Sequence, residues 1–277
     1  MKLKNCMILG LSVMTLLTGC QNTEKSEKIT EQSLETVSES ETDSRYIKNI
    51  TKKVEEETTT ISETETESES KNENLDNLDY KAYAEYQMKK ETNDIIATIK
   101  VKDKGDIKIK LFSEAAPKAV ENFITHAKEG YYNGLTFHRV INDFMIQSGD
   151  PKGNSTGGES IWGQPFENEC TLELVPYKGA LCMANQGTDN SNTSQFFIVT
   201  ANPNEEIIKE LITNNYPNSL IESYKTYGGA PWLYQSYTVF GQVIEGLEIA
   251  EDIQKVRTDN NDKPVENVIV EKIEITE

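Results

Sequence analysis

The sequence predicts a mainly β fold, in which short strands close into an antiparallel barrel. From about residue 93 onwards, short apolar or alternating segments follow one another, glycine-rich turns separate them, and only two or three segments have helical spacing. The residues before that point differ in composition. The chain is therefore expected to contain a signal peptide (1–19), a tether (20–88) and a β domain (89–277).

The first 20 residues predict export. Lys2 and Lys4 precede a mostly apolar run, which at roughly 14 residues is shorter than a membrane-spanning helix and typical of a secretory signal core. The run ends in LTGC, which resembles the lipobox of bacterial lipoproteins and marks Cys20 as the lipidation site. We expect acyl chains, palmitate among them, to anchor the protein to the extracytoplasmic face of the cell membrane. An uncleaved anchor helix or a signal peptide without lipidation is the alternative.

The segment 20–88 is rich in Ser, Thr and Glu and holds almost no aromatic residue before Tyr80. Such a segment cannot bury enough apolar surface to offset its chain entropy, so it is expected to be a disordered tether. Its excess of acidic residues keeps it away from an anionic membrane. A helix over 75–90 is an open alternative at its end, because LDNLDYKAYAEYQMKK has apolar residues near helical spacing.

Charge and cysteine usage exclude some classes of protein. The formal net charge is −18 and no cluster of Lys and Arg occurs, which argues against a nucleic-acid partner. With only His126 and His138 in the chain, no metal site is expected. Outside the first 20 residues the cysteines are Cys170 and Cys182. We expect free thiols, although an exported protein could form a disulfide.

The elements of the β domain follow from local patterns. Segments 95–101 and 106–112 alternate in part and are joined by KDKG, which predicts a hairpin. A helix is expected over 114–127, with Pro117 in its first turn and Gly130 after its end. A second helix is expected over 247–256. The remaining strands are predicted at 136–140, 144–149, 181–184, 196–200, 238–243 and 268–275.

The stretch FHRVINDFMIQSGD is apolar enough for two buried strands, yet it contains Arg139 and Gln147. A buried guanidinium without a partner would cost several kcal/mol, as an order of magnitude. Strand alternation places Phe137 with Arg139 on one face, and Met145 with Gln147 on one face. If the two strands are neighbours, Arg139, Met145 and Gln147 converge on the outer surface of the barrel. Arg139 is then expected to line a pocket.

Four motifs, in the order FHRVINDFMIQSGDP, TGGESIWGQPFENE, LCMANQGTDNSNTSQFFI and YTVFGQVIEGLEI, resemble the cyclophilin-type peptidyl-prolyl cis-trans isomerases. The resemblance covers about residues 93–277. It implies an eight-stranded antiparallel barrel with a helix over each end, and an active groove on the outer wall. It also implies a reaction that needs no cofactor.

The resemblance assigns the site residue by residue. Arg139 is implied as the catalytic arginine, and Gln147 as a groove glutamine that orients the substrate carbonyl and holds Arg139 by a hydrogen bond. The residues implied to bind substrate are Phe144, Met145, Ala184, Asn185, Gln195, Phe197, Trp232, Leu233 and Tyr237.

This chain departs from the family pattern at several places. Ser148 replaces a usual glycine, Asn142 a frequent proline, and Tyr237 a frequent histidine. Gln186 and one extra residue in the following loop are expected to reshape the rim of the groove. The largest departure is the segment 204–229, which reads as two short helices and is either a surface addition or a wall that sets specificity.

Another pattern competes with this interpretation. GNSTG, at 153–157, matches the G-x-S-x-G elbow of serine hydrolases. A nucleophile elbow follows a strand and opens a helix, whereas glycines flank this segment and nothing helical follows. The segment is expected to be a loop beside the groove.

The sequence thus predicts a lipid-anchored prolyl isomerase that assists the folding of secreted proteins. Its expected partners are proline-containing unfolded or nascent secreted polypeptides. Cyclosporin-like macrocycles are a further expected ligand class, because Trp232 is implied in the groove. We expect a monomer. A peptide-binding module or holdase chaperone that uses the same groove without catalysis is the alternative.

Overall fold

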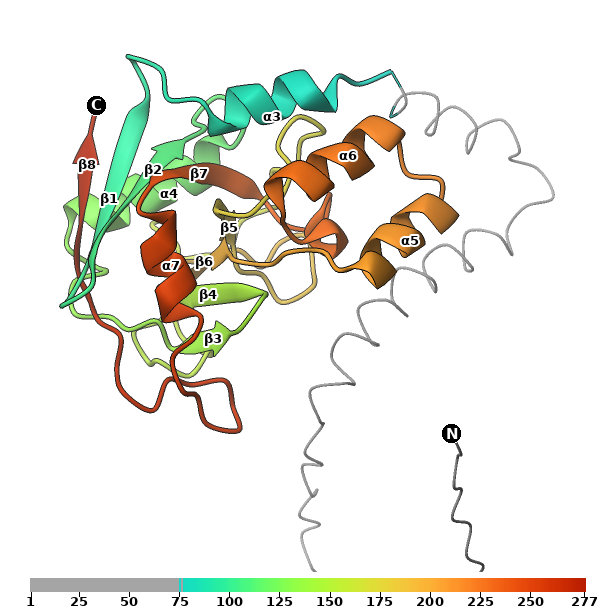
Figure 1. Cartoon of the computed structure of the whole chain (residues 1–277). Helices are drawn as coiled ribbons and strands as arrows, with labels where there is room; N and C mark the ends of the chain where they lie inside the picture. The colour runs from blue at the N-terminus through green and yellow to red at the C-terminus, as the bar shows by residue number, and fades with distance from the viewer. Residues whose placement is uncertain (1–74, 76) are drawn as a thin grey trace, which may run out of the picture. The chain divides into compact units, whose positions relative to one another are not determined.

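In the computed structural model, which describes residue 75 and residues 77–277, eight strands form one antiparallel sheet (Figure 1). The sheet has the order β3-β4-β6-β5-β7-β2-β1-β8. The predicted signal peptide and the tether up to residue 74 lie outside the described residues. In chain order the strands are β1 (Ile95–Val101), β2 (Gly105–Leu111), β3 (Arg139–Ile141), β4 (Met145–Ser148), β5 (Ala180–Met183), β6 (Phe196–Val199), β7 (Val239–Glu245) and β8 (Val270–Thr276).

The predicted hairpin is confirmed. Strands β1 and β2 pair in antiparallel register, with Ile99 opposite Ile107. Between them Asp103 and Gly105 adopt positive φ values of 59° and 120°, which aspartate tolerates in a tight turn and glycine adopts without steric cost. Alternate residues of β1 are buried in the main core, so the hairpin supplies one wall of that core.

The expected closed barrel is wrong, because the curled sheet stays open between its end strands. No ladder joins β3 to β8 in the described part of the chain, where a single bridge, Thr136 with Ile269, lies between them. Next to it the Phe137 amide donates to the Val268 carbonyl (2.9 Å). Strand β3 has only three residues. The bridged residues, Thr136 and Ile269, precede β3 and β8 in the chain. The fold is an open half-barrel.

Two helices cover the sheet as expected, with shifted bounds. Helix α4 (Pro117–Lys128) begins with proline in its first turn and ends before Gly130, whose φ is +74°. It buries Val120 and Phe123 in the main core. Helix α7 (Leu247–Ile253) follows Gly246, whose φ is +83°, and ends three residues earlier than predicted.

Three further helices share a second hydrophobic cluster. They are α3 (Tyr80–Met88), α5 (Glu205–Thr213) and α6 (Asn218–Tyr227), and in Figure 1 α3 passes beside α6. Helices α5 and α6 confirm that the segment 204–229 holds two short helices. The cluster consists of Tyr80, Ala84, Val175, Tyr177, Leu211, Leu220, Ile221 and Tyr224.

Helix α3 is docked on the sheet by two buried side chains. Lys110 of β2 is 1% exposed, and its Nζ donates to the carbonyls of Tyr86 (2.9 Å) and Lys89 (2.8 Å), at the C-terminal end of α3. Gln87 is fully buried and donates to the Val175 carbonyl (2.8 Å) and to Gln242 Oε1 (2.9 Å). The segment 80–88, expected within the tether, is therefore a packed helix.

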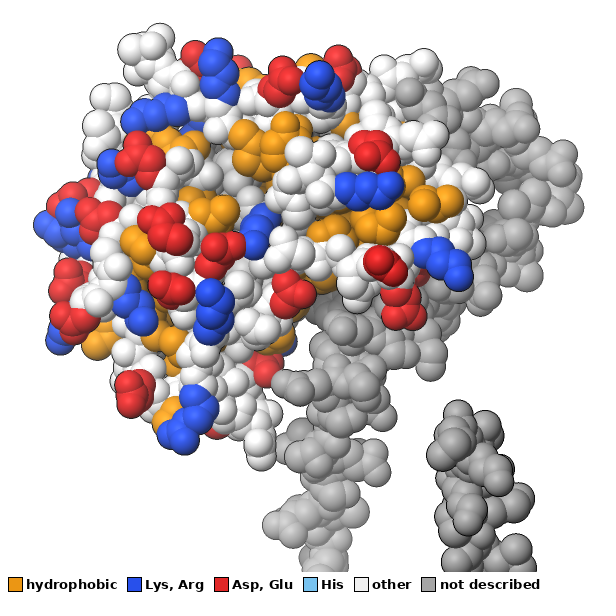
Figure 2. Space-filling view, in the orientation of Figure 1, with side chains coloured by type: hydrophobic (Ala, Val, Ile, Leu, Met, Phe, Trp, Pro, Cys, Tyr) orange, Lys and Arg blue, Asp and Glu red, His pale blue; other side chains and the backbone are white. Residues whose placement is uncertain are grey.

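Charges of both signs are mixed on the surface. On the face shown in Figure 2, Lys and Arg side chains lie among Asp and Glu side chains, and no continuous basic area forms on that face. None of the helices that the structure describes is long and apolar enough to cross a membrane. Cys170 and Cys182 are free, as expected, and burial raises the pKa of both thiols, that of Cys170 to about 11.

Candidate active site

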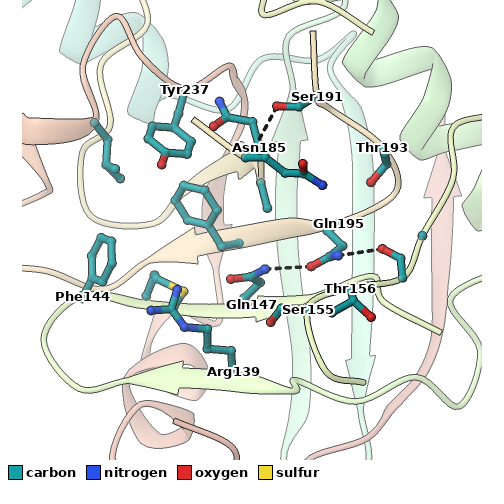
Figure 3. A pocket seen from close by; sticks show the side chains of 17 residues that line it. Arg139, Phe144, Gln147, Ser155, Thr156, Asn185, Ser191, Thr193, Gln195 and Tyr237 are labelled. Atoms are coloured by element: carbon teal, nitrogen blue, oxygen red, sulfur yellow. Dashed lines mark hydrogen bonds between the residues drawn. The ribbon is translucent and has the colours of Figure 1, made fainter. Parts of the chain in front are cut away.

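A pocket of about 310 Å³ lies on the outer face of the sheet, over β3, β4 and β6 (Figure 3). All the predicted site residues in the β domain except Trp232 line it. Cys20, the predicted lipidation site, lies outside the described residues. The lining residues that were expected are Arg139, Phe144, Met145, Gln147, Ala184, Asn185, Gln195, Phe197, Leu233 and Tyr237.

Strand alternation brings the central residues of the pocket together. Arg139 of β3 pairs with Gln147 of β4, and the neighbouring pair, Val140 and Ile146, is buried in the main core. Side chains alternate across a sheet, so Arg139, Met145 and Gln147 face the pocket as predicted. Phe137 was expected on the face of Arg139 but is also in the main core, because β3 begins only at Arg139 and the alternation does not extend back to it.

Arg139 is held by an acidic partner from a distant loop. Its Nε donates to Asp262 Oδ2 at 3.2 Å, and the side chain is 32% exposed. In Figure 3 the guanidinium lies between Phe144 and Gln147. Two features explain how an apolar stretch accommodates the charged Arg139. The side chain is paired with a carboxylate, and it lines a pocket.

Gln147 takes part in a chain of amide hydrogen bonds. Its Nε2 donates to Gln195 Oε1 (2.8 Å), and Gln195 Nε2 donates to the Gly157 carbonyl (2.7 Å). Both side chains are 8% exposed. The expected hydrogen bond from Gln147 to Arg139 is not found, since Gln195 orients Gln147 and Asp262 holds Arg139. In Figure 3 the carboxamide oxygen of Gln147 faces the Arg139 side of the pocket.

One half of the pocket is apolar. The rings of Phe197 and Tyr237 meet edge to face, with centroids 5.7 Å apart. Leu233 ends the short 3₁₀ helix η1 (Pro231–Leu233), and its carbonyl accepts from the Tyr237 amide (3.2 Å). Trp232, predicted to bind substrate, does not line the pocket but packs against Phe144, with the two ring centroids 5.6 Å apart.

The other half is polar and uncharged, and the sequence analysis missed most of it. The GNSTG segment lies beside the groove as expected, but Ser155, Thr156 and Gly157 also line the pocket. Asp150 supports this loop by accepting from the amides of Lys152 (2.7 Å) and Asn154 (3.0 Å). Asp150, two residues after the end of β4 and followed by a glycine-rich turn, was a local signal for such a loop. The other missed residues are Gly158, Ser191 and Thr193, while Gln186 lies on the rim as expected.

The family model for cyclophilin-type peptidyl-prolyl cis-trans isomerases matches residues 96–275. This chain belongs to the cyclophilin family. The match includes residues of all eight strands and every described residue of the pocket. The protein is therefore a peptidyl-prolyl cis-trans isomerase.

Relatives and solved structures agree with this assignment. A protein of Staphylococcus saprophyticus named "Putative peptidyl-prolyl cis-trans isomerase" is 51% identical over 176 residues, 63% of this chain and 89% of the relative. A Staphylococcus epidermidis protein of the same name is 49% identical over 193 residues, 69% of this chain and 98% of the relative. The crystal structure of a Cryptosporidium parvum cyclophilin-type isomerase superposes with a TM-score of 0.54 at 33% identity, covering 66% of this chain and 98% of that one. The same protein has also been crystallised in the presence of the dipeptide Ala-Pro.

Proposed function

We propose that this cyclophilin isomerises X-Pro bonds with Arg139 as the catalytic residue. Rotation about the bond breaks amide resonance, over a barrier of about 18–20 kcal/mol. In the twisted state the prolyl nitrogen gains a lone pair that can accept a hydrogen bond. The observation that carries the proposal is the position of the guanidinium of Arg139, which lies at the junction of the apolar and polar halves of the pocket. A donor at that point stabilises the twisted amide more than the planar one.

The two halves of the pocket then have different tasks. Phe144, Met145 and Phe197, with Leu233 and Tyr237, hold the pyrrolidine ring in an apolar site, where a hydrogen bond from Arg139 is stronger than in water. In the polar half, the carboxamide oxygen of Gln147 and the amide donors hold the peptide backbone of the substrate. Asn185 and Ala184 lie on the rim of this half. No step of this reaction transfers a proton.

Replacing Gln147 by alanine is expected to lower kcat/KM about fivefold, because a net contribution of about 1 kcal/mol from one neutral hydrogen bond is lost from the transition state. Gln147 is more buried than the sequence suggested, so the free energy of unfolding should also fall, by about 1 kcal/mol. A protease-coupled X-Pro peptide assay and urea unfolding measure the two effects.

Gln242 provides the matched control for that variant. It is a buried glutamine of β7, 1% exposed and outside the pocket. Gln242→Ala should reduce stability and leave kcat/KM at the wild-type value. An unchanged kcat/KM in Gln147→Ala would contradict the role given to this residue.

We further propose that the enzyme acts on unfolded or nascent secreted polypeptides from a lipid anchor at Cys20, on the extracytoplasmic face of the cell membrane. The lipobox-like LTGC and the Ser/Thr/Glu-rich segment after it support this. Replacing Cys20 by alanine should move the protein from the membrane fraction to the soluble fraction, as measured by fractionation and immunoblotting.

Cys6→Ala is the control for the anchor, since it alters the same N-terminal run and keeps Cys20. It should stay in the membrane fraction. If Cys20→Ala also partitions into detergent like the wild type, an uncleaved N-terminal helix is the anchor instead. Binding of cyclosporin-like macrocycles and a monomeric state remain predictions. Indole fluorescence would report macrocycle binding, because the ring of Trp232 packs against Phe144, which lines the pocket.

A further inference from the structure

The hydrogen bond between Arg139 and Asp262 joins a pocket residue to one outside the pocket. Asp262 does not line the cavity, yet its Oδ2 lies 3.2 Å from Arg139 Nε. We propose that Asp262 is a positioning residue, which holds the guanidinium of Arg139 in the orientation that the twisted amide needs. This inference rests on the catalytic role of Arg139 proposed above.

The atom that Asp262 contacts matters for this role. A guanidinium has five N–H donors, of which one is at Nε and four are at the two Nη atoms. Asp262 accepts from Nε, on the side of the group nearer the backbone. The terminal donors are then left for the prolyl nitrogen or the neighbouring carbonyl. A bidentate pair through the Nη atoms would have occupied those donors.

Several hydrogen bonds hold the loop that carries Asp262. Its two arms are joined by the Asp259 amide, which donates to the Lys263 carbonyl (2.8 Å). The side chain of Asp259 accepts from the amides of Asn261 (2.8 Å) and Lys263 (3.1 Å). Asp262 itself has a φ of +60°, a conformation that Asp and Asn adopt more readily than most residues. The sequence of this turn therefore favours the placement of the carboxylate.

A second contact fixes the loop to the strand that carries Arg139. The Val140 amide donates to the Asp262 carbonyl at 2.8 Å. One residue of the loop thus binds the backbone of β3 through its carbonyl and the side chain of Arg139 through its carboxylate. This two-point attachment restricts the long arginine side chain before substrate binds, so less rotamer freedom is lost in the transition state.

The exposure of the pair distinguishes positioning from stabilisation. The side chains of Arg139 and Asp262 are 32% and 33% exposed. Ion pairs that are so accessible to water contribute little to the stability of a fold. Loss of the carboxylate should therefore affect the rate far more than the unfolding transition.

The test compares Asp262→Gly with Asp262→Asn in the full-length chain, purified in mild detergent. Glycine and asparagine both tolerate the positive φ at position 262, so neither variant strains the turn. Only asparagine keeps a side-chain oxygen that can accept from Arg139 Nε. We expect Asp262→Gly to lower kcat/KM roughly tenfold, since misplaced catalytic groups lose large factors in rate. Asp262→Asn should stay within about threefold of the wild type, and both variants should keep a Tm near the wild-type value.

The matched control is Glu251→Ala, which removes a carboxylate of similar exposure (34%) that pairs with Lys178 away from the pocket. It should leave kcat/KM unchanged. A spectroscopic readout is the NMR signal of the Arg139 Nε–H group. This signal should be protected from exchange in the wild type and lose that protection in Asp262→Gly, with partial protection in Asp262→Asn.

The double variant Arg139→Ala/Asp262→Gly separates the possible failures. It should be no slower than Arg139→Ala, because Asp262 acts through Arg139. A slower double variant, or wild-type kcat/KM in Asp262→Gly while Arg139→Ala is impaired, would overturn the positioning role alone. Wild-type kcat/KM in Arg139→Ala would instead overturn the proposed catalytic role of Arg139.

Discussion

Arg139→Ala is expected to lower kcat/KM for X-Pro isomerisation by about 10- to 100-fold, measured in a protease-coupled peptide assay. A hydrogen bond from a charged donor contributes about 1.5–3 kcal/mol, and each ~1.4 kcal/mol corresponds to tenfold in rate. The guanidinium contacts the twisted amide more strongly than the planar one, so the loss should appear mainly in kcat rather than in KM. The residual activity should come from the apolar half of the pocket, which still binds the proline.

Two variants control this experiment. Arg139→Lys keeps a positive charge but lacks the planar array of donors, so it should recover only part of the rate. Arg257→Ala removes an exposed arginine that does not line the pocket and should retain the full rate. Equal kcat/KM for Arg139→Ala and the wild type would show that another group stabilises the twisted amide. Retained peptide binding without any catalysis by the wild type would favour the holdase alternative.

Deletion of residues 24–90, which removes α3, is expected to destabilise the domain by about 5 kcal/mol or more. The deletion takes away the fully buried Tyr80 and both carbonyls that accept from Lys110. Burial of one large apolar side chain is worth about 1.5–3 kcal/mol, and each of the two lost hydrogen bonds from the charged Lys110 contributes about 1.5–3 kcal/mol. Guanidinium chloride unfolding, followed by circular dichroism, measures the difference.

Deletion of residues 24–74 is the matched control, because it keeps α3 and its N-cap, Asp79, whose side chain accepts from the Ala82 amide (3.0 Å). This variant should unfold at the wild-type midpoint and keep the full peptide-isomerisation rate. Lys110→Met in the 24–90 deletion should restore part of the lost stability, since it removes a buried charge that has lost both carbonyl acceptors and keeps Asp94, whose Oδ1 lies 3.8 Å from Lys110 Nζ. A 24–90 deletion as stable as the wild type would show that α3 is dispensable for the fold.

Much of the fold and site could be predicted from the sequence, because the determining interactions are local. The alternation of apolar residues placed Arg139, Met145 and Gln147 on one face of two adjacent strands, and the structure confirms that these three face the pocket. Helical spacing and turn residues located α4, α5 and α6. Element bounds differed by a few residues, because the ends of strands and helices depend on neighbours that are distant in the chain.

The sequence by itself determined the order of most elements and the shared face of Arg139, Met145 and Gln147, since these follow from periodicities of two and 3.6 residues. The other pocket residues that were predicted came from the resemblance to the cyclophilins. Only the tertiary structure decided which groups hold those residues. Asp262 lies 123 residues from Arg139 and Gln195 lies 48 residues from Gln147, so neither partner has a local signature. The docking of α3 by Lys110 and the open edge between β3 and β8 also lack a local signature. Both depend on packing between segments that are distant in the chain.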